Sequence, residues 1–373
     1  MTSSWTDRYL AIRDRWLSSP RFQRWAAAFP ITRPTARRRA RALFDVCAGF
    51  VYSQILFACV RLKLFELLAL GPHSVDSIAT SLNLPLASTE RLLEAAVSLR
   101  LVEKRVAGRF GLGTLGAALV GNPAVGAMIE HHSLLYADLH DPVGLLRGEQ
   151  RQTELAKYWA YSASDSPASL ASARTTDYTS LMADSQPLVA AEILDAYPLN
   201  KHRCLLDAGG GDGSFLIEAA KRCEQLKLIL FDLPAVAERA ARRFESVGLK
   251  ARAQAIGGDF LKDDLPRGAD VLTLIRVVHD HNDDGAAMIL RAAHRALSPR
   301  GVLLLAEPMM GTPGAETVGD AYFGFYLLAM GRGRARNPRD LQQMLTTAGF
   351  SSTQLLRTRQ PLQSRLILAR RGD

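Results

Sequence analysis

The pattern of apolar and polar positions changes character near residue 200. Beyond it, short apolar runs of strand length alternate with stretches in which apolar residues recur every three or four positions. The runs predict strands ending at Leu206 and over 227–231, 251–256, 270–276 and 302–307. The stretches between them predict helices over 214–225, 234–246 and 283–297. Such alternation is typical of an α/β fold with a doubly wound parallel sheet.

Before residue 200 the apolar positions recur mostly at helical spacing. Residues 42–70 predict a long helix interrupted near Gly49, and because it is apolar around most of its circumference we expect it to be buried. Two short helices follow, the second over 88–93 with Ser88 as its N-cap, and then a hairpin over 101–112. This order predicts a winged-helix unit, and the acidic, leucine-rich second helix favours a structural or dimerisation role over DNA binding.

A glycine-rich stretch stands where the first predicted strand gives way to a helix. Asp207 ends the strand, and Gly209, Gly211 and Gly213 follow at alternating positions. Strand, tight turn and helix N-terminus form the usual cradle for a nucleotide-like ligand. Ser214 stands where a dinucleotide fingerprint has its third glycine, which disfavours a nicotinamide dehydrogenase. An acid at this strand end suits a cationic group, such as the amino end of S-adenosylmethionine.

Two further acids follow the next two predicted strands. Asp232 ends the second strand, where a carboxylate is placed to accept hydrogen bonds from both hydroxyls of a ribose. Asp259 and Phe260 follow the third strand, and an acid beside an aromatic ring can bracket an adenine. Because the carboxyl ends of parallel strands share one edge of a sheet, the three acids predict an adenosyl-group site.

A histidine follows the fourth predicted strand. A side chain at this place in an open α/β sheet faces the crevice where ligands bind. His279, in its neutral form, is therefore predicted to take the proton of a substrate hydroxyl while the hydroxyl oxygen attacks an electrophilic methyl group. Glu307 ends the neighbouring strand and is placed to hydrogen-bond that imidazole.

Two alternatives for this histidine stay open. One is a metal site, with the candidate ligands His279, Asp280, His281, Asp283 and Asp284. The other is a purely structural histidine. Residues 282–284 fit the N-cap and first turn of the next helix better than a ligand set, so no metal ion is expected.

The composition is that of a soluble globular enzyme, with 48% apolar and 22% charged residues over 373 positions. The four cysteines form no C-x-x-C pair, which indicates reduced thiols in a cytoplasmic protein. No secretory signal is visible. The longest uncharged run near the N-terminus, residues 46–60, is shorter than the roughly 18 apolar residues of a membrane span, so no transmembrane segment is predicted.

The net charge of +9 is concentrated near the N-terminus, where residues 1–45 hold ten arginines and three aspartates. The remainder is close to neutral, so no nucleic-acid partner is predicted. Aromatic residues alternate with these arginines, and four apolar side chains fall on one helical face: Trp5, Tyr9, Ile12 and Trp16. Such an arm can lie on an inner or intracytoplasmic membrane surface beside anionic lipid, or it can pack on a partner subunit.

Taken in order, these motifs resemble the plant-type small-molecule O-methyltransferases. The resemblance covers the chain from residue 42 to the end. Five short motifs carry it: D-x-G-G-G-D-G from Asp207, F-D-L-P at Asp232 and Leu233, G-G-D-F ending at Phe260, H-D-x-x-D from His279, and A-E-P at Glu307. It implies a class I S-adenosylmethionine-dependent methyltransferase fold, an N-terminal dimerisation domain, a homodimer, and a base at His279.

The resemblance also implies a set of cofactor-binding residues. They are Asp207, Gly209, Gly211, Asp232, Leu233, Asp259, Phe260 and Arg276. Arg276 is expected to act for a lysine that plant members have at the position of Ile275. His281 stands where the family often has tryptophan, and residues 333–338 lack the second acid that supports the histidine in plant members, so His279 is expected to depend on Glu307 alone.

Within this family, the arginine-rich arm and residues 44–54 look most like the carotenoid O-methyltransferases of purple photosynthetic bacteria. That likeness implies methylation of the tertiary 1-hydroxyl of an acyclic carotenoid, a hydrophobic small-molecule substrate. The apolar segments 321–330 and 50–57 are expected to line its channel or to form a dimer core. A bacteriochlorophyllide C-methyltransferase and a non-catalytic winged-helix metabolite sensor remain as alternatives.

Together the patterns divide the chain into four parts. Residues 1–41 form a basic aromatic arm, and residues 42–120 form a winged-helix-like dimerisation domain. Residues 121–200 form a helical linker and substrate region with a loop at 162–167, and residues 201–373 form the S-adenosylmethionine-binding catalytic domain.

Overall fold

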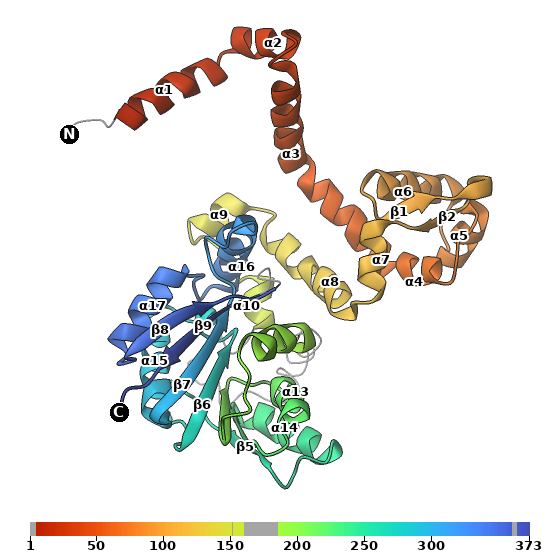
Figure 1. Cartoon of the computed structure of the whole chain (residues 1–373). Coiled ribbons are helices and arrows are strands. Elements are labelled where there is room, and N and C mark those ends of the chain that lie inside the picture. The colour runs from red at the N-terminus through yellow and green to blue at the C-terminus, as the bar shows by residue number, and fades with distance from the viewer. Residues whose placement is uncertain (1–4, 151, 160–185, 360–363) are drawn as a thin grey trace. The chain divides into compact units, whose positions relative to one another are not determined.

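The computed structural model describes residues 5–150, 152–159, 186–359 and 364–373. The chain forms two compact units, Met1–Asn122 and Pro123–Asp373, and each is described by itself (Figure 1). The loop expected at 162–167 lies outside the described residues.

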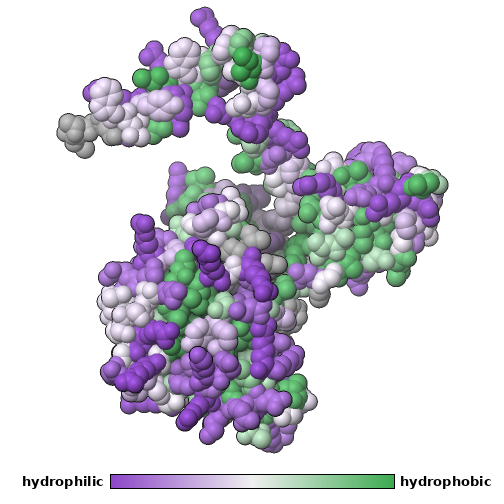
Figure 2. Space-filling model, in the orientation of Figure 1, coloured by the Kyte–Doolittle hydropathy of each residue, from purple (hydrophilic) through white to green (hydrophobic). Residues whose placement is uncertain are grey.

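The first unit begins with three helices in succession, α1 (Trp5–Leu17), α2 (Pro20–Ala28) and α3 (Arg33–Arg61). The N-cap of α2 is Ser19, whose hydroxyl accepts a hydrogen bond from the Phe22 amide, and proline at the first helical position suits this start. No residue of α1 is buried. In Figure 2 hydrophilic and hydrophobic residues lie next to one another over these helices.

Helix α3 corrects the expectation of an interruption near Gly49. It runs unbroken through this residue, where an added Cβ would meet no atom within 4 Å, and it starts at Arg33, within the predicted arm of residues 1–41. The helix is also not buried within one chain, since Phe44 is 63% exposed and Phe50 is 73% exposed. An apolar helix left in water needs a partner surface.

Among the described residues, α3 is also the one helix that is long and apolar enough to cross a membrane, judged by length and composition. The mean hydropathy of its most apolar 18-residue window is 1.8, and 6% of that window is buried. The prediction of no such segment considered only the uncharged run 46–60, which is shorter than this helix.

The rest of the first unit is the predicted winged-helix pattern. It contains α4 (Leu64–Ala69), α5 (Val75–Leu82), α6 (Leu86–Ser98), β1 (Val102–Lys104), β2 (Phe110–Leu112) and α7 (Thr114–Val120). The hairpin is confirmed, with β1 and β2 antiparallel. Ser88 is not an N-cap, because α6 begins after Pro85 and Ser88 lies inside the helix. Leu64, Phe65, Ile78 and Leu93 form the core of this unit.

The second unit is built on a seven-stranded sheet of order β5-β4-β3-β6-β7-β9-β8. Its strands are β3 (Cys204–Ala208), β4 (Lys227–Asp232), β5 (Ala253–Gly257), β6 (Ala269–Ile275), β7 (Leu297–Glu307), β8 (Ser352–Leu356) and β9 (Arg365–Arg370). The five predicted strands are confirmed and pair in parallel. The sheet is nevertheless mixed, because β9, which the sequence pattern missed together with β8, runs antiparallel between β7 and β8.

Helices cover both faces of this sheet (Figure 1). The helical residues 186–196 pack with α13 (Ser214–Arg222) and α14 (Pro234–Ser246) on one face, around buried Phe215 and Phe244. Helices α15 (Asp283–Ala296) and α17 (Pro338–Thr347) pack on the other. The predicted doubly wound α/β arrangement is confirmed.

A third apolar cluster belongs to helices outside these two layers. It joins α8 (Pro123–Asp138), α9 (Pro142–Leu146), α10 (Glu154–Tyr158) and α16 (Phe323–Met330), and the π-helix η4 (Thr317–Tyr322) leads directly into α16. π-helical turns occur preferentially at functional sites. Residues of α8, η4 and α16 form one wall of the cavity described next.

Candidate active site

A cavity of about 410 Å³ lies in the second unit, over the carboxyl ends of the parallel strands. One side is formed by the loops after β3, β4, β5 and β6, and the other by residues of α8, η4 and α16. The strand order places β3 beside β6, where the direction of strand addition reverses. Ligands of open α/β sheets bind at this point.

The glycine-rich loop after β3 forms the floor of the cavity. Gly209 has φ +75°, and a Cβ there would come within 2.6 Å of the Val277 side chain. Gly211 has φ +61° and borders open space on the cavity side. Both conformations are ones that glycine adopts without strain. A side chain at either position would distort the loop or fill the cradle, so the loop fits a ligand held against bare backbone.

Asp207 does not line the cavity, contrary to its expected contact with the ligand. Thr273 Oγ1 donates a hydrogen bond to Asp207 Oδ1 over 2.6 Å. Asp207 Oδ2 has no hydrogen-bond partner among the described residues and lies under the loop, where a Cβ at Gly210 would come within 2.6 Å of it. Burial raises the pKa of Asp207 to about 7, against the opposing hydrogen bond from Thr273 and with the help of the Asp232 charge. The carboxyl group therefore lies beneath the glycine loop and outside the cavity lining.

Asp232 faces the cavity at the end of β4. Its Oδ2 accepts a hydrogen bond from the Gly211 amide over 2.8 Å, and its Oδ1 accepts one from the Leu233 amide over 2.7 Å. Burial raises the pKa of this carboxyl to about 6, although both amide hydrogen bonds act in the opposite direction. Asp232 thus fixes the glycine loop and presents its carboxylate to the same cavity, which Leu233 also lines.

Asp259 and Phe260, after β5, line the cavity as well. Asp259 is buried, and its Oδ1 accepts a hydrogen bond from the Leu261 amide over 3.0 Å. The Phe260 ring meets the His281 ring edge to face, with the ring centroids 5.6 Å apart. An acid and two rings therefore meet at this part of the wall.

Arg276 lines the cavity from an unusual backbone conformation. Its φ is +55°, in the left-handed region, while its amide still donates to the Ala306 carbonyl over 2.8 Å. Non-glycine residues held in this region cluster at functional sites. The turn ends β6 sharply and brings the next residues over the sheet edge.

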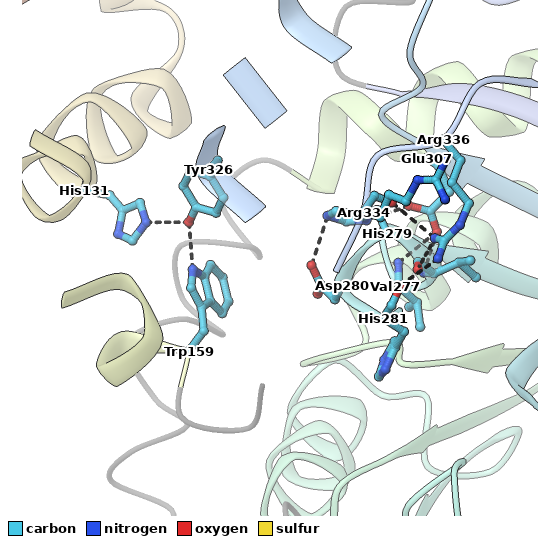
Figure 3. A network of polar contacts seen from close by, with 11 residues as sticks. His131, Trp159, Val277, His279, Asp280, His281, Glu307, Tyr326, Arg334 and Arg336 are labelled. Atoms are coloured by element: carbon cyan, nitrogen blue, oxygen red, sulfur yellow. Dashed lines mark hydrogen bonds and ion pairs between the residues drawn. The ribbon is translucent and has the colours of Figure 1, made fainter. Parts of the chain in front are cut away.

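His279 lies on the short helix η3 (Val278–Asp280) and borders the cavity. Its Nδ1 is 2.6 Å from Glu307 Oε2, so the predicted pair is confirmed (Figure 3). The other oxygen, Glu307 Oε1, accepts hydrogen bonds from the amides of Val277 and Val278 over 3.1 and 2.7 Å. Both ring nitrogens face a carboxylate, but Glu307 Oε2 at 2.6 Å from Nδ1 is nearer than Asp280 Oδ1 at 3.2 Å from Nε2. We therefore assign the proton of the neutral ring to Nδ1 and its basic site to Nε2.

The pKa of His279 is set by opposing effects. Burial, the largest of them, and the Arg276 charge lower it, but the carboxylates of Asp280, whose Oδ1 is 3.2 Å from Nε2, and of Glu307 outweigh them, so the pKa is raised overall. His279 therefore has two carboxylates beside it, and not Glu307 alone as the sequence had suggested. A base of this kind is neutral above its raised pKa, and its cation is well stabilised.

The acids after His279 do not gather around a metal ion. Among the described residues no group of three His, Cys, Asp or Glu side chains is placed to hold one. Asp283 turns to the guanidinium groups of Arg334 and Arg336. Asn282 is the N-cap of α15 by position only, since its side chain makes no capping hydrogen bond and Asn282 Oδ1 accepts from the Gly333 amide.

Helix α8 lies in the predicted helical linker and substrate region 121–200, but none of its individual residues was predicted to line the cavity. His132 Nε2 lies 2.7 Å from the Tyr322 hydroxyl, and His131 Nε2 lies 2.7 Å from the Tyr326 hydroxyl. Trp159 Nε1 also donates to the Tyr326 oxygen over 2.7 Å (Figure 3). The adjacent histidines of an otherwise apolar helix were the available signal for this wall.

The segment 321–330, expected to line a substrate channel or to form a dimer core, contributes four of its residues to the cavity. Tyr322, Phe323, Tyr326 and Met330 line the cavity, and the Phe323 ring meets the His279 ring edge to face at 5.9 Å. The second predicted segment, residues 50–57, belongs to α3 of the first unit.

Comparisons with known proteins agree with this geometry. Residues 136–351 match the family model of the O-methyltransferase domain, and residues 44–122 match that of the O-methyltransferase dimerisation domain. The demethylspheroidene O-methyltransferase of Cereibacter sphaeroides is 39% identical over 341 residues, which cover 91% of this chain and 89% of that protein. The enzyme of the same name from Rhodobacter capsulatus is 38% identical over 346 residues, which cover 92% and 85%.

The fold is shared with solved structures. A crystal structure of human N-acetylserotonin methyltransferase in complex with S-adenosylmethionine has a TM-score of 0.73 and 24% identity, and the match covers 90% of this chain and 98% of that one.

The chain therefore belongs to the O-methyltransferase family, on the class I methyltransferase fold. It is an enzyme that uses S-adenosylmethionine as its methyl donor. This sets aside the non-catalytic sensor. The dimerisation domain supports a homodimer, and it includes the exposed apolar half of α3.

Proposed function

We propose that this enzyme methylates the tertiary 1-hydroxyl of an acyclic carotenoid of the demethylspheroidene or hydroxyneurosporene type. The proposal rests on the 39% identity, over 91% of the chain, to a demethylspheroidene O-methyltransferase. It is supported by the wall of the cavity opposite the glycine loop, which aromatic and methionine side chains of α8, η4 and α16 line and where the Phe323 ring meets His279. A long apolar polyene suits such a wall.

The cofactor half of the cavity is assigned from its lining residues. Asp232 takes the two ribose hydroxyls, Asp259 and Phe260 bracket the adenine with Leu233 beside them, and the backbone from Gly209 to Gly211 holds the methionyl end. Arg276 borders this half from the end of β6. Asp207 lies beneath the glycine loop and outside the cavity lining, so no direct contact with the cofactor is assigned to it.

The reaction needs a base and an oriented hydroxyl. When bound, S-adenosylmethionine supplies an electrophilic methyl group. His279 Nε2 accepts the hydroxyl proton as the O–CH₃ bond forms, because a tertiary alcohol is too weak an acid to lose that proton beforehand. Glu307 holds the imidazole through Nδ1, and the carboxylates of Glu307 and Asp280 stabilise the imidazolium that results. Orientation in a water-poor cavity contributes much of the rate.

The substrate assignment is tested with methyl-labelled S-adenosylmethionine. Purified enzyme is incubated with a detergent-dispersed 1-hydroxy carotenoid, with the matching carotenoid that lacks the hydroxyl, and with a bacteriochlorophyllide. Label is expected in a methyl ether of the hydroxy carotenoid alone. Label in the tetrapyrrole alone, or in none of the three despite cofactor binding, would overturn the assignment.

We propose that the N-terminal arm rests on an anionic lipid surface, from which an apolar substrate is collected. Trp5, Tyr9, Ile12 and Trp16 of α1 are exposed in the chain, and ten arginines stand among the first 45 residues. Aromatic side chains settle in the interface of a bilayer while arginines meet anionic headgroups. The enzyme is then peripheral to the membrane on its cytoplasmic side.

The arm is expected to drive cosedimentation with vesicles that contain anionic phosphatidylglycerol. Replacement of both Trp5 and Trp16 by serine should weaken binding by at least tenfold, and high salt should weaken it in the wild type. The matched control replaces Val106 by serine, since this residue is equally exposed in the first unit but lies outside the arm. Equal binding to neutral vesicles at all salt concentrations, or none to either, contradicts the proposal and favours a partner-subunit contact.

A further inference from the structure

The segment between α16 and α17 closes over the loop that carries His279. The Arg334 amide donates to the His279 carbonyl over 2.7 Å, and the Gly333 amide donates to Asn282 Oδ1 over 3.2 Å. Gly333 approaches the loop so closely that a Cβ would collide with the His279 carbonyl oxygen. The two segments are more than fifty residues apart in the chain and pack backbone to backbone.

Arg336 is the side chain that completes this contact. It is 3% exposed. Its Nη1 donates to the Val278 carbonyl over 3.0 Å, and its Nη2 donates to the His281 carbonyl over 2.8 Å. One guanidinium thus holds the backbone on both sides of His279 (Figure 3).

The charge of Arg336 is balanced by Asp283. Arg336 Nε and Nη2 lie 3.0 and 2.8 Å from Asp283 Oδ1, and the hydrogen bonds from Arg336 hold the pKa of that carboxyl below its usual value. Burying a guanidinium costs free energy that a single, partly exposed carboxylate only partly offsets. An apolar side chain would fill the same space without that cost. The value of Arg336 therefore lies in the fixed geometry of its guanidinium donors.

We propose that Arg336 is a positioning residue for the catalytic base. By holding the carbonyls of Val278 and His281, it keeps the His279 ring against Glu307 at the edge of the cavity. The inference rests on the proposed role of His279 as the base.

Lysine cannot replace this arginine. A lysine retains the charge and can meet Asp283, but it is a single point donor and cannot span two carbonyls and a carboxylate at once. With lysine, the loop that carries His279 is held less firmly. Misplacement of a reacting group such as this imidazole by about 1 Å costs on the order of 100-fold in rate.

Arg334 provides a matched control from the same segment. Its Nη1 pairs with the same carboxylate, at 2.9 Å from Asp283 Oδ2, and its side chain is 58% exposed. Its hydrogen bond to the His279 carbonyl comes from the backbone amide, which a substitution leaves in place.

The experiment compares Arg336→Lys and Arg334→Lys with the wild-type enzyme. Arg336→Lys is expected to lower kcat by about 10- to 100-fold, while the Kd of S-adenosylhomocysteine and the thermal midpoint change little. The contact with Glu307 loosens, so the pKa of His279 falls and the acid limb of the rate profile moves to lower pH. The low-field proton NMR signal of His279 Nδ1–H should broaden. Arg334→Lys should change none of these.

Two outcomes would overturn the inference. One is an Arg336→Lys enzyme with a kcat within twofold of the wild type and an unmoved acid limb. The other is a variant that loses cofactor binding and thermal stability along with kcat, which indicates a general structural role. Failure of the base proposal itself looks different, because the His279→Ala enzyme would then retain its turnover.

Discussion

Replacement of His279 by alanine is expected to lower kcat by about 10²- to 10⁴-fold, the usual contribution of a general base. The imidazole is the basic side chain at the edge of the cavity that Glu307 orients, with 2.6 Å between His279 Nδ1 and Glu307 Oε2. Without it, the proton of an alcohol has no acceptor of suitable basicity as the methyl group is transferred. The affinity for S-adenosylhomocysteine should stay within threefold, because the residues assigned to the cofactor, at the ends of β3 to β6, do not include His279.

The pH dependence of the wild type adds a second test of the same residue. The carboxylates of Asp280 and Glu307 raise the pKa of His279 above its ordinary value despite burial. A base works in its neutral form, so kcat/KM should fall as the pH drops through this raised pKa. Glu307→Gln removes one of the two charges, and the acid limb should then move to lower pH. In His279→Ala the limb should disappear. A His279→Ala enzyme with kcat within tenfold of the wild type contradicts the base assignment.

Replacement of Asp232 by alanine is expected to weaken S-adenosylhomocysteine binding by about 10²- to 10⁴-fold. Hydrogen bonds to a charged group contribute about 1.5–3 kcal/mol each, and the carboxylate is assigned two from the ribose. The same carboxylate accepts the amides of Gly211 and Leu233, so its loss also releases the glycine loop. Isothermal titration calorimetry measures the effect directly.

The matched control for this prediction is Asp264→Ala. Asp264 is an exposed acid of the same domain that does not line the cavity, and its removal should leave the Kd unchanged. Burial raises the pKa of Asp232 to about 6, so the wild-type affinity should weaken below pH 6, where the carboxyl must lose a proton before it can accept the hydroxyls. In Asp232→Asn this dependence should vanish. A Kd within threefold of the wild type in Asp232→Ala contradicts the ribose assignment.

Much of the site was predictable from local sequence patterns and one rule of topology, that the carboxyl ends of parallel strands lie at one edge of the sheet. Strand and helix periodicity located β3 to β7, and in a parallel sheet all carboxyl ends meet at one edge. That rule brings Asp232, Asp259 and His279 to one cavity and places Glu307 beside the histidine. No knowledge of side-chain packing is needed for this step.

The rule does not tell which side of a loop a side chain occupies. Asp207 follows the same pattern as Asp232, yet it lies beneath the glycines while Asp232 faces the cavity. Its position is decided by Thr273 on the neighbouring strand, 66 residues later in the chain. Helix α3 shows a related limit, since its apolar surface predicts burial but not the molecule that provides it.

The sequence by itself determined the α/β class, the glycine-rich cradle, the acids at the strand ends and the histidine with its glutamate, because each follows from residue order and local periodicity. Only the tertiary structure decided which residues of α8 meet those of η4 and α16 in the cavity wall, the antiparallel strand β9 and the hold of Arg336 on the His279 loop. Arg336 and Val278 are 58 residues apart, and His131 and Tyr326 are 195 apart. Contacts at such separations arise from the packing of whole elements, which no local pattern contains.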